Sequence, residues 1–158
     1  MLLYYENGNG YKNDVSNKCI EQYSNINLSL ADIIEAECEK VDFFDKLDLL
    51  INRIQHTVYD IAGIIIVLDN KNELDILLSY KNLFDDIYIL LILLGENPAM
   101  FTKSLELRPR YIVYWKKEKK EIIAILHNFV RIIKKRNLLT NPNALRHIFM
   151  PKNGISNK

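Results

Sequence analysis

The chain has 158 residues, of which 49% are hydrophobic and 26% charged, with only five Gly and four Pro. This size and composition are typical of one packed globular domain and exclude disordered, collagenous and low-complexity proteins. Two cysteines, Cys19 and Cys38, are too few for a disulfide framework, and no basic and apolar leader is evident, so we expect a cytoplasmic protein. The longest apolar run, Ile87 to Leu94, is far shorter than the roughly 20 residues of a membrane helix, so no membrane contact is expected.

Charge is distributed unevenly along the chain, although the formal net charge is only +1. Residues 1–100 hold seven Lys or Arg and 17 Asp or Glu, a balance of −10, whereas residues 101–158 hold 14 basic and three acidic residues, a balance of +11. This uneven distribution has two interpretations. The charges serve solubility alone, or they form a basic face that binds an acidic partner or a second copy of the chain. The sequence leaves both interpretations open.

Apolar runs and helical periodicity alternate along the chain. Strands are predicted where apolar residues are continuous or alternate with polar ones, and helices where they recur every three or four residues. The predicted strands are 2–5, 33–38, 61–68, 87–94 and 111–115. One helix is predicted to begin near residue 13, and four more are predicted at 43–54, 73–84, 98–107 and 121–136. The fully apolar strands 61–68 and 87–94 are expected at the centre of a sheet, and the strand 33–38, in which apolar residues alternate with glutamates, nearer its edge.

This alternation predicts an α/β fold. Five strands and five helices joined by short loops favour parallel pairing through right-handed crossovers, with helices on both faces of the sheet. The expected architecture is a three-layer (βα)5 sandwich whose five-stranded parallel sheet has the flavodoxin-like order 2-1-3-4-5. We expect one domain at residues 1–137 and a polar C-terminal tail at 138–158.

The candidate site residues follow the predicted strands, because ligands of open parallel sheets bind beyond the carboxyl ends of the strands. These residues are Glu6, Asn7, Asp69, Gly95, Glu96 and Lys116. A carboxylate after the first strand, an aspartate after the third and a lysine after the fifth resemble the receiver domains of bacterial response regulators (CheY-like). The resemblance covers residues 1–137 and rests on topology and spacing. Residues 43–130, which include the phrase LELRPRYIVYW, also resemble uncharacterised bacterial receiver-like proteins.

The resemblance implies a role for each matching residue. In receivers the third-strand aspartate accepts a phosphoryl group, acids after the first strand help to hold Mg²⁺, and the lysine pairs with the phosphoryl charge. On this sequence Asp69 matches the phosphoacceptor, Glu6 with Asp69 the Mg²⁺ ligands, and Lys116 the cation.

Other positions depart from the family's pattern. Asn7 stands where receivers have a second acid, which removes a charge from a cation that prefers anionic oxygens. Gly95 replaces the Ser or Thr of the family, and Glu96 adds negative charge beside the phosphoryl position. Lys117 follows Lys116 where proline is usual. Because like charges about 4 Å apart cost on the order of 1–4 kcal/mol, we expect a vestigial phosphoacceptor site without a cofactor.

The favoured hypothesis is a pseudo-receiver, a non-enzymatic protein-binding module of signal transduction whose output does not depend on phosphorylation. The output face of receivers, formed by the fourth helix, fifth strand and fifth helix, corresponds to residues 98–137. Its basic side chains are expected to contact a histidine kinase, an output protein or a second copy of the chain. They are Arg131, Lys134, Lys135 and Arg136.

Alternative interpretations stay open. One is a phosphorylatable receiver of a two-component phosphorelay, with Asp69 as acceptor and Mg²⁺ as cofactor. Another is nucleic-acid binding through the basic C-terminal region, which ranks last because no recognition helix or base-stacking motif is evident. Residue by residue, Asp69 also fits a helix-capping loop and Lys116 a solvated loop. Arg108 and Arg110, which flank Pro109, fit either an anion clamp or a helix end.

Overall fold

A computed structural model describes residues 1–7, 34, 38, 40–56, 60–115 and 119–140 of the chain. The described strands are β1 (Leu2–Glu6), β2 (Val41–Phe44), β3 (Gly63–Leu68), β4 (Tyr88–Leu93) and β5 (Tyr111–Tyr114). The described α-helices are α4 (Leu47–His56), α5 (Lys71–Ser79), α6 (Pro98–Ser104) and α7 (Lys119–Thr140). Two 3-10 helices, η2 (Lys81–Phe84) and η3 (Leu105–Leu107), extend α5 and α6. Strands and helices thus alternate from β2 to α7, as the apolar pattern predicts.

The strands form one parallel sheet in the order β2-β1-β3-β4-β5. This confirms the predicted fold class and strand order. All six residues of β3 are buried, and so are five of the six in β4. Continuous apolar sequence suits such strands because both of their faces are covered.

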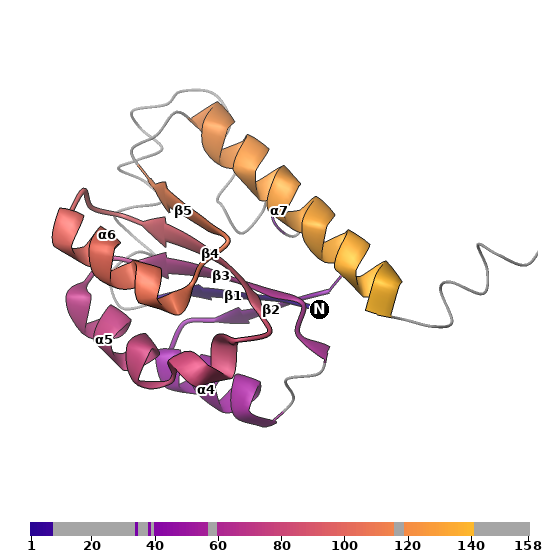
Figure 1. The fold of residues 1–158 in the computed structure, drawn as a ribbon, viewed down its shortest axis with the longest axis horizontal. Coiled ribbons are helices and arrows are strands. Elements are labelled where there is room, and N and C mark those ends of the chain that lie inside the picture. The colour runs from indigo at the N-terminus through magenta and orange to yellow at the C-terminus, as the bar shows by residue number, and fades with distance from the viewer. Residues whose placement is uncertain (8–33, 35–37, 39, 57–59, 116–118, 141–158) are drawn as a thin grey trace, which may run out of the picture.

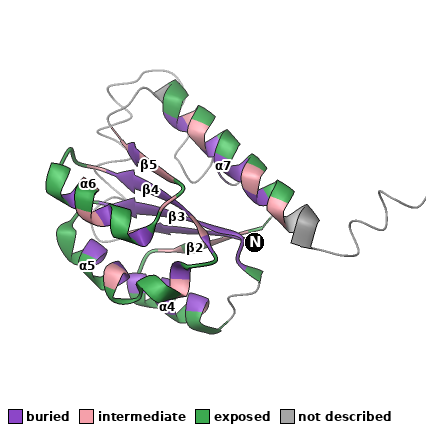
Figure 2. Cartoon of the chain, viewed as in Figure 1, coloured by how far each residue is buried: buried purple, intermediate pink, exposed green. Residues whose placement is uncertain are grey.

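Helices lie on both faces of the sheet (Figure 1), and a layer of buried apolar side chains lies on each face. Successive side chains of a strand point to opposite faces, so β1 and β3 contribute to both layers. Leu3, Tyr5, Ile64 and Ile66 pack against α4, α5 and α6, whereas Tyr4, Ile65 and Val67 belong to the layer of α7. The buried residues of the helices lie on their sheet-facing sides (Figure 2). Each helix therefore needs only one apolar stripe, which is the periodicity seen in the sequence.

The second strand differs from its predicted position. The prediction of a strand at 33–38 is wrong, because Ile34 is helical and its carbonyl oxygen accepts the N–H of Cys38 at 3.0 Å. The strand is β2, which lies at the sheet edge and pairs with β1 from Val41 against Leu2. Phe43 belongs to β2, so the helix predicted at 43–54 begins only at Leu47.

Other boundaries shift by smaller amounts. The helix predicted at 73–84 is α5 followed by η2, and Tyr80 separates them. Helix α7 begins before residue 121 and runs to Thr140, past the predicted domain boundary at residue 137. The predicted helix near residue 13 and the tail beyond residue 140 lie outside the described residues, so the domain division stays a prediction. Within the described part, no helix has the length and apolarity needed to cross a membrane.

Candidate functional site

The candidate site lies at the carboxyl edge, which we define as the edge of the sheet where β1, β3 and β4 end. Glu6 pairs in register with Val67, so Asp69 stands two residues beyond that partner. The N–H of Leu94 donates to the carbonyl oxygen of Leu68 at 2.9 Å, which keeps β3 and β4 together up to their last residues. The structure therefore brings Glu6, Asp69 and Gly95 to the same edge.

The position of Lys116 lies outside the described residues, and so does that of Lys117. The preceding residue, Trp115, donates its N–H to the carbonyl oxygen of Leu93 at 2.8 Å. The chain thus follows β4 as far as Trp115. The expected pairing of a lysine with Asp69 stays a prediction.

Glu6 is engaged by a tyrosine of its own strand. The hydroxyl of Tyr4 donates to Oε2 of Glu6 at 2.5 Å. Tyr4 is buried, and burial together with the neighbouring Glu6 carboxylate raises the pKa of its phenol well above the usual value. The phenol is therefore a permanent donor at neutral pH, and it holds one oxygen of the carboxylate expected to bind Mg²⁺.

The side chain of Asn7 is hydrogen-bonded to a carboxylate that was not among the candidate site residues. Its Nδ2 donates to Oε1 of Glu73, in the first turn of α5. Glu73 is only 7% exposed, and its Oε2 has no hydrogen-bond partner among the residues that the structure describes. The same carboxylate acts on Tyr5, whose pKa is raised first by burial and then by Glu73. The side chain of Glu73 is thus buried where α5 begins.

Capping explains why the helices begin at this edge. Oδ1 of Asn70 accepts the N–H of Glu73 at 3.0 Å, so the cap of α5 is Asn70 and not Asp69. Asn97 caps α6 in the same way, accepting the N–H groups of Ala99 and Met100 at 3.0 and 3.1 Å. Asp69 is left exposed at the end of β3.

The loop after β4 has room for a larger side chain. Gly95 and Glu96 are exposed, and a Cβ atom added to Gly95 would meet no atom of the described residues within 4 Å. A hydroxyl residue would therefore fit at this position. Packing among the described residues thus does not require glycine at this position.

The described residues match the Mg²⁺ site of a receiver only in part. The described residues contain no group of three or more His, Cys, Asp or Glu side chains placed to hold a metal ion. The two carboxylates expected to bind Mg²⁺ are those of Glu6 and Asp69, and Asn7 is neutral. Mg²⁺ is usually held by carboxylates and phosphate oxygens in near-ideal octahedral geometry. The expected pair of ligands is present, but no complete ligand set accompanies it.

The basic residues predicted to bind a partner lie on α7 and do not share one environment. Lys134 and Lys135 are exposed, as is Arg131, whose Nη2 donates to Oδ1 of Asn128 at 3.2 Å. Arg136 is half-buried, with its guanidinium carbon 4.7 Å from the centroid of the Tyr88 ring. Arg136 thus faces the sheet, and the exposed basic surface consists of the other three residues.

Glu73, Tyr4 and Tyr5 also belong to this edge, although the sequence did not point to them as site residues. One signal was available for Glu73, because Asn70 and Glu73 have the spacing of a helix cap and the third residue after it. That spacing places Glu73 over the strand ends, but it does not show that the carboxylate is buried. Tyr4 and Tyr5 lie in an apolar run whose sequence predicts only a buried strand.

Comparisons with known proteins find similarity only among solved structures. No family model matches the chain, and no curated protein matches it. The chain is similar to a response regulator receiver domain protein (CheY-like) from Methanospirillum hungatei, with a TM-score of 0.55 and 11% identity over 85% of this chain and 96% of that chain. A response regulator protein from Burkholderia pseudomallei, with a phosphorylated aspartic acid, calcium ion and citrate, gives a TM-score of 0.50 and 15% identity over 93% and 80%.

A third similar structure is a candidate pilus assembly-related protein from Burkholderia pseudomallei, with a TM-score of 0.54 and 11% identity over 82% of this chain and 88% of that chain. Identities this low carry the fold and no residue roles. Two of the three structures are response regulator proteins, and the strand order of the sheet is the one expected for a receiver. The chain therefore has the fold of a CheY-like response regulator receiver domain.

Proposed function

We propose that the chain is a pseudo-receiver, a non-enzymatic regulatory module that binds a protein partner without phosphorylation of Asp69. The observation that carries the proposal is the engagement of both residues that follow the core of β1. Glu6 accepts from Tyr4, and Asn7 donates to the buried Glu73. The side chains that would face a metal ion in a receiver are thus satisfied within the protein.

Electrostatics supports the same conclusion. Phosphorylation of Asp69 would replace a carboxylate of charge −1 by an acyl phosphate of about −2, a net gain of about one negative charge at an edge that already holds Glu6, Glu73 and Glu96. Each like-charge pair at a partly solvated distance of 4 Å costs on the order of 1–4 kcal/mol. Without a divalent cation to offset this repulsion, the phosphorylated form would be poorly populated.

The proposed binding surface is the face formed by α6, β5 and α7. Its exposed cations on α7 include Arg131, Lys134 and Lys135. None of the ion pairs found in the described part of the chain involves these three side chains. Unpaired surface charges of one sign steer the approach of a partner of opposite sign. An acidic surface of a kinase, of an output protein or of a second copy of this chain would match it.

Intact-protein mass spectrometry after incubation with acetyl phosphate and Mg²⁺ tests the proposal. We expect the mass of the wild type to stay unchanged, as it does for Asp69→Asn. A Mg²⁺-dependent gain of one phosphoryl group that Asp69→Asn abolishes would overturn the proposal. A receiver domain that phosphorylates under the same conditions is the positive control.

One observation favours the phosphorylatable receiver as a second candidate function. Asp69 is exposed at the end of β3, and the space beside Gly95 is open. On that side, none of the described residues would obstruct a phosphodonor within 4 Å of a Cβ at Gly95. The mass experiment decides between the two candidates, because only this second one predicts a product.

A further inference from the structure

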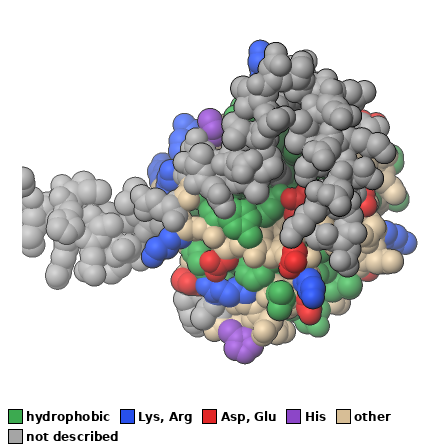
Figure 3. All heavy atoms as spheres, turned by 180° about the vertical axis from the view of Figure 1, so that it is seen from behind, with side chains coloured by type: hydrophobic (Ala, Val, Ile, Leu, Met, Phe, Trp, Pro, Cys, Tyr) green, Lys and Arg blue, Asp and Glu red, His purple; other side chains and the backbone are tan. Residues whose placement is uncertain are grey.

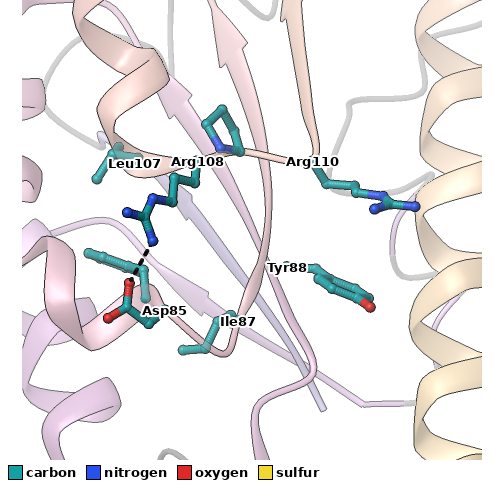
Figure 4. Close-up of a pocket in the computed structure, with 8 residues that line it drawn as sticks. Asp85, Ile87, Tyr88, Leu107, Arg108 and Arg110 are labelled. Atoms are coloured by element: carbon teal, nitrogen blue, oxygen red, sulfur yellow. Dashed lines mark ion pairs between the residues drawn. The ribbon is translucent and has the colours of Figure 1, made fainter.

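A pocket lies at the opposite edge of the sheet, which we call the amino edge, between the loop that leads into β4 and the loop that leads into β5 (Figure 4). Its volume is about 430 Å³. Asp69 lies beyond the other end of β3, at the carboxyl edge. The pocket therefore depends neither on the candidate site nor on the pseudo-receiver assignment.

The pocket has two parts, because its lining comes from both faces of the sheet. Ile87 belongs to the apolar layer of α4, α5 and α6, whereas Tyr88 packs against the layer of α7. Phe84 and Leu107 belong to the same layer as Ile87 and are only 3% and 4% exposed, so they form an apolar floor. Arg110 points toward Tyr88 and away from this floor (Figure 4).

The part with the apolar floor carries one charge of each sign. Arg108 is directed at Asp85, and the Nη1 and Oδ1 atoms of the pair are 3.9 Å apart (Figure 4). This is longer than a charge-assisted hydrogen bond of about 2.7–2.9 Å, and neither side chain takes part in another ion pair found among the described residues. With side-chain exposures of 86% and 62%, the pair contributes little to stability. A ligand that bridges the two groups therefore loses little by displacing their mutual attraction.

The backbone of Arg108 also supports a role for its side chain. Arg108 is the one non-glycine residue of the described chain with a positive φ, at φ 51° and ψ 48°. Glycine adopts this conformation without strain, and strained residues gather at functional sites. An arginine here supplies a guanidinium at the pocket that glycine could not.

We propose that this pocket binds a free α-amino acid with an apolar side chain. Its carboxylate accepts from the guanidinium of Arg108, whose planar donors match two carboxylate oxygens, and its ammonium donates to Asp85. Both groups of an amino acid are attached to one carbon, so they lie close together, as the two charges of the pocket do. The apolar side chain lies over the floor of Phe84, Ile87 and Leu107.

Electrostatics favours this zwitterion over a simple anion or cation. An anion attracted by Arg108 would be repelled by Asp85, and a cation attracted by Asp85 would be repelled by Arg108. Only a ligand with both charges satisfies both side chains. The ammonium and the carboxylate are therefore each required for binding.

An NMR titration of the ¹⁵N-labelled protein tests the ligand class with three compounds. L-Leucine carries both charges, N-acetyl-L-leucine lacks the ammonium, and L-leucinamide lacks the carboxylate. We expect L-leucine to shift the amide signals of Asp85 and Arg108 with a Kd of about 1 mM, and the two derivatives to bind about tenfold more weakly or not at all. No shift with L-leucine at about 10 mM, or equal binding of either derivative, would overturn the proposal.

Substitutions then locate the site. Arg108→Gly removes the guanidinium and suits the left-handed backbone, so the variant is expected to fold and to bind L-leucine about tenfold more weakly or less. Asp85→Asn should weaken binding in the same direction. Arg131→Gln is the matched control, because it removes an exposed arginine of α7 that does not line the pocket. Wild-type affinity in the Arg108→Gly variant would overturn the proposal, whatever the result of phosphorylation experiments on Asp69.

Discussion

Two buried tyrosines of β1 predict that the protein loses stability at alkaline pH. The pKa values of Tyr4 and Tyr5 are raised in the folded chain, mainly by burial and secondarily by Glu6 and Glu73. Above the ordinary tyrosine pKa of about 10, the unfolded chain releases these protons and the folded chain keeps them. The free energy of unfolding is therefore fully maintained below pH 10 and falls above it, by up to about 1.4 kcal/mol per pH unit for each tyrosine.

Urea unfolding between pH 8 and about pH 11 measures this slope. Tyr5→Phe is expected to flatten it by the share of one tyrosine, because the phenylalanine has no proton to lose. Tyr80→Phe, at an exposed position, is the control and should keep the wild-type slope. A Tyr5→Phe variant with the full wild-type slope would contradict the prediction.

One residue just before β5 has a left-handed backbone conformation, and its replacement by glycine is expected to stabilise the fold. Arg108 has φ 51° and ψ 48°, and Pro109 follows it. This conformation costs a residue with a Cβ atom roughly 1–2 kcal/mol, and glycine avoids that cost while it gains flexibility in the unfolded chain. We expect Arg108→Gly to raise the free energy of unfolding by about 0.5–1 kcal/mol, measured by urea denaturation.

Arg108→Ala separates the backbone effect from the loss of the side chain. It removes the same exposed guanidinium and keeps the Cβ atom, so its stability should stay near that of the wild type. The Arg108–Asp85 ion pair is exposed on both sides, with side-chain exposures of 86% and 62%, so its loss contributes little. Equal stability of the Gly and Ala variants would show that the turn stores no strain.

At the scale of elements, the contact between α7 and β3 depends on Gly63. A Cβ atom there would overlap Cδ1 of Ile133 and lie 3.3 Å from Cζ of Phe129. Overpacking of this kind costs about 1–3 kcal/mol, so Gly63→Ala is expected to lower the free energy of unfolding by that amount. Combining it with Ile133→Val, which removes the overlapping methyl group, should recover part of the loss in a double-mutant cycle.

Gly95→Ala is the matched control for this prediction, because a Cβ atom at Gly95 meets nothing within 4 Å. It should change stability by less than about 0.5 kcal/mol. Additive effects of Gly63→Ala and Ile133→Val would contradict a direct clash between α7 and β3.

The individual strands and helices show how much of the fold could be predicted from the sequence alone. Strands β3 and β4 were predictable because burial on both faces demands continuous apolar residues. The short edge strand β2 was missed because it is only half-buried, and Phe43 stands four residues before Leu47, so it reads as the first turn of α4. At 33–38 the spacing of Ile34 and Cys38 is helical, although glutamates alternate with apolar residues there.

The candidate site was predictable to a similar extent. The ends of the central strands are marked by the change from apolar to polar residues, which placed Glu6, Asp69 and Gly95. The hydrogen bonds of Glu6 and Asn7 were not predictable, because they depend on which way side chains turn at the edge. The burial of Glu73 depends on how closely α5 lies over β1, which no local pattern encodes.

At the scale of the whole molecule, the acidic and basic residues that are separated along the sequence also differ between the two faces of the sheet. Helices α4 and α5 cover one face of the sheet, and α7 covers the other (Figure 1). Basic residues on the side of α6 are matched, as Lys103 with Asp75 and Lys81 with Glu106. Blue side chains gather where α7 lies, whereas red and blue mix elsewhere on the described surface in view (Figure 3). No ion pair found among the described residues involves Arg131, Lys134 or Lys135 of α7.

This arrangement predicts weak, salt-sensitive self-association, in which α7 of one copy binds the acidic face of another. The acidic face is the side of the sheet that α4 and α5 cover. Exposed acids on that face include Asp45, Asp48 and Asp75. At low salt such opposite surfaces attract over about 10–30 Å, whereas at 1 M salt the range falls to about 3 Å. Multi-angle light scattering should show a mass above that of the monomer at low salt only. Reversing Lys134 and Lys135 together to Glu should weaken the association by about tenfold.

The matched control reverses Lys46 and Lys71, two exposed lysines on the opposite side of the sheet, so that both double variants change the net charge equally. If attraction depends on α7, the control pair should associate at least as strongly as the wild type, because it makes the acidic face more acidic. If total charge alone governs solubility, both variants should behave alike. A monomeric wild type at low salt, or equal weakening by the two variants, would remove self-association and leave a distinct acidic protein as the partner of α7.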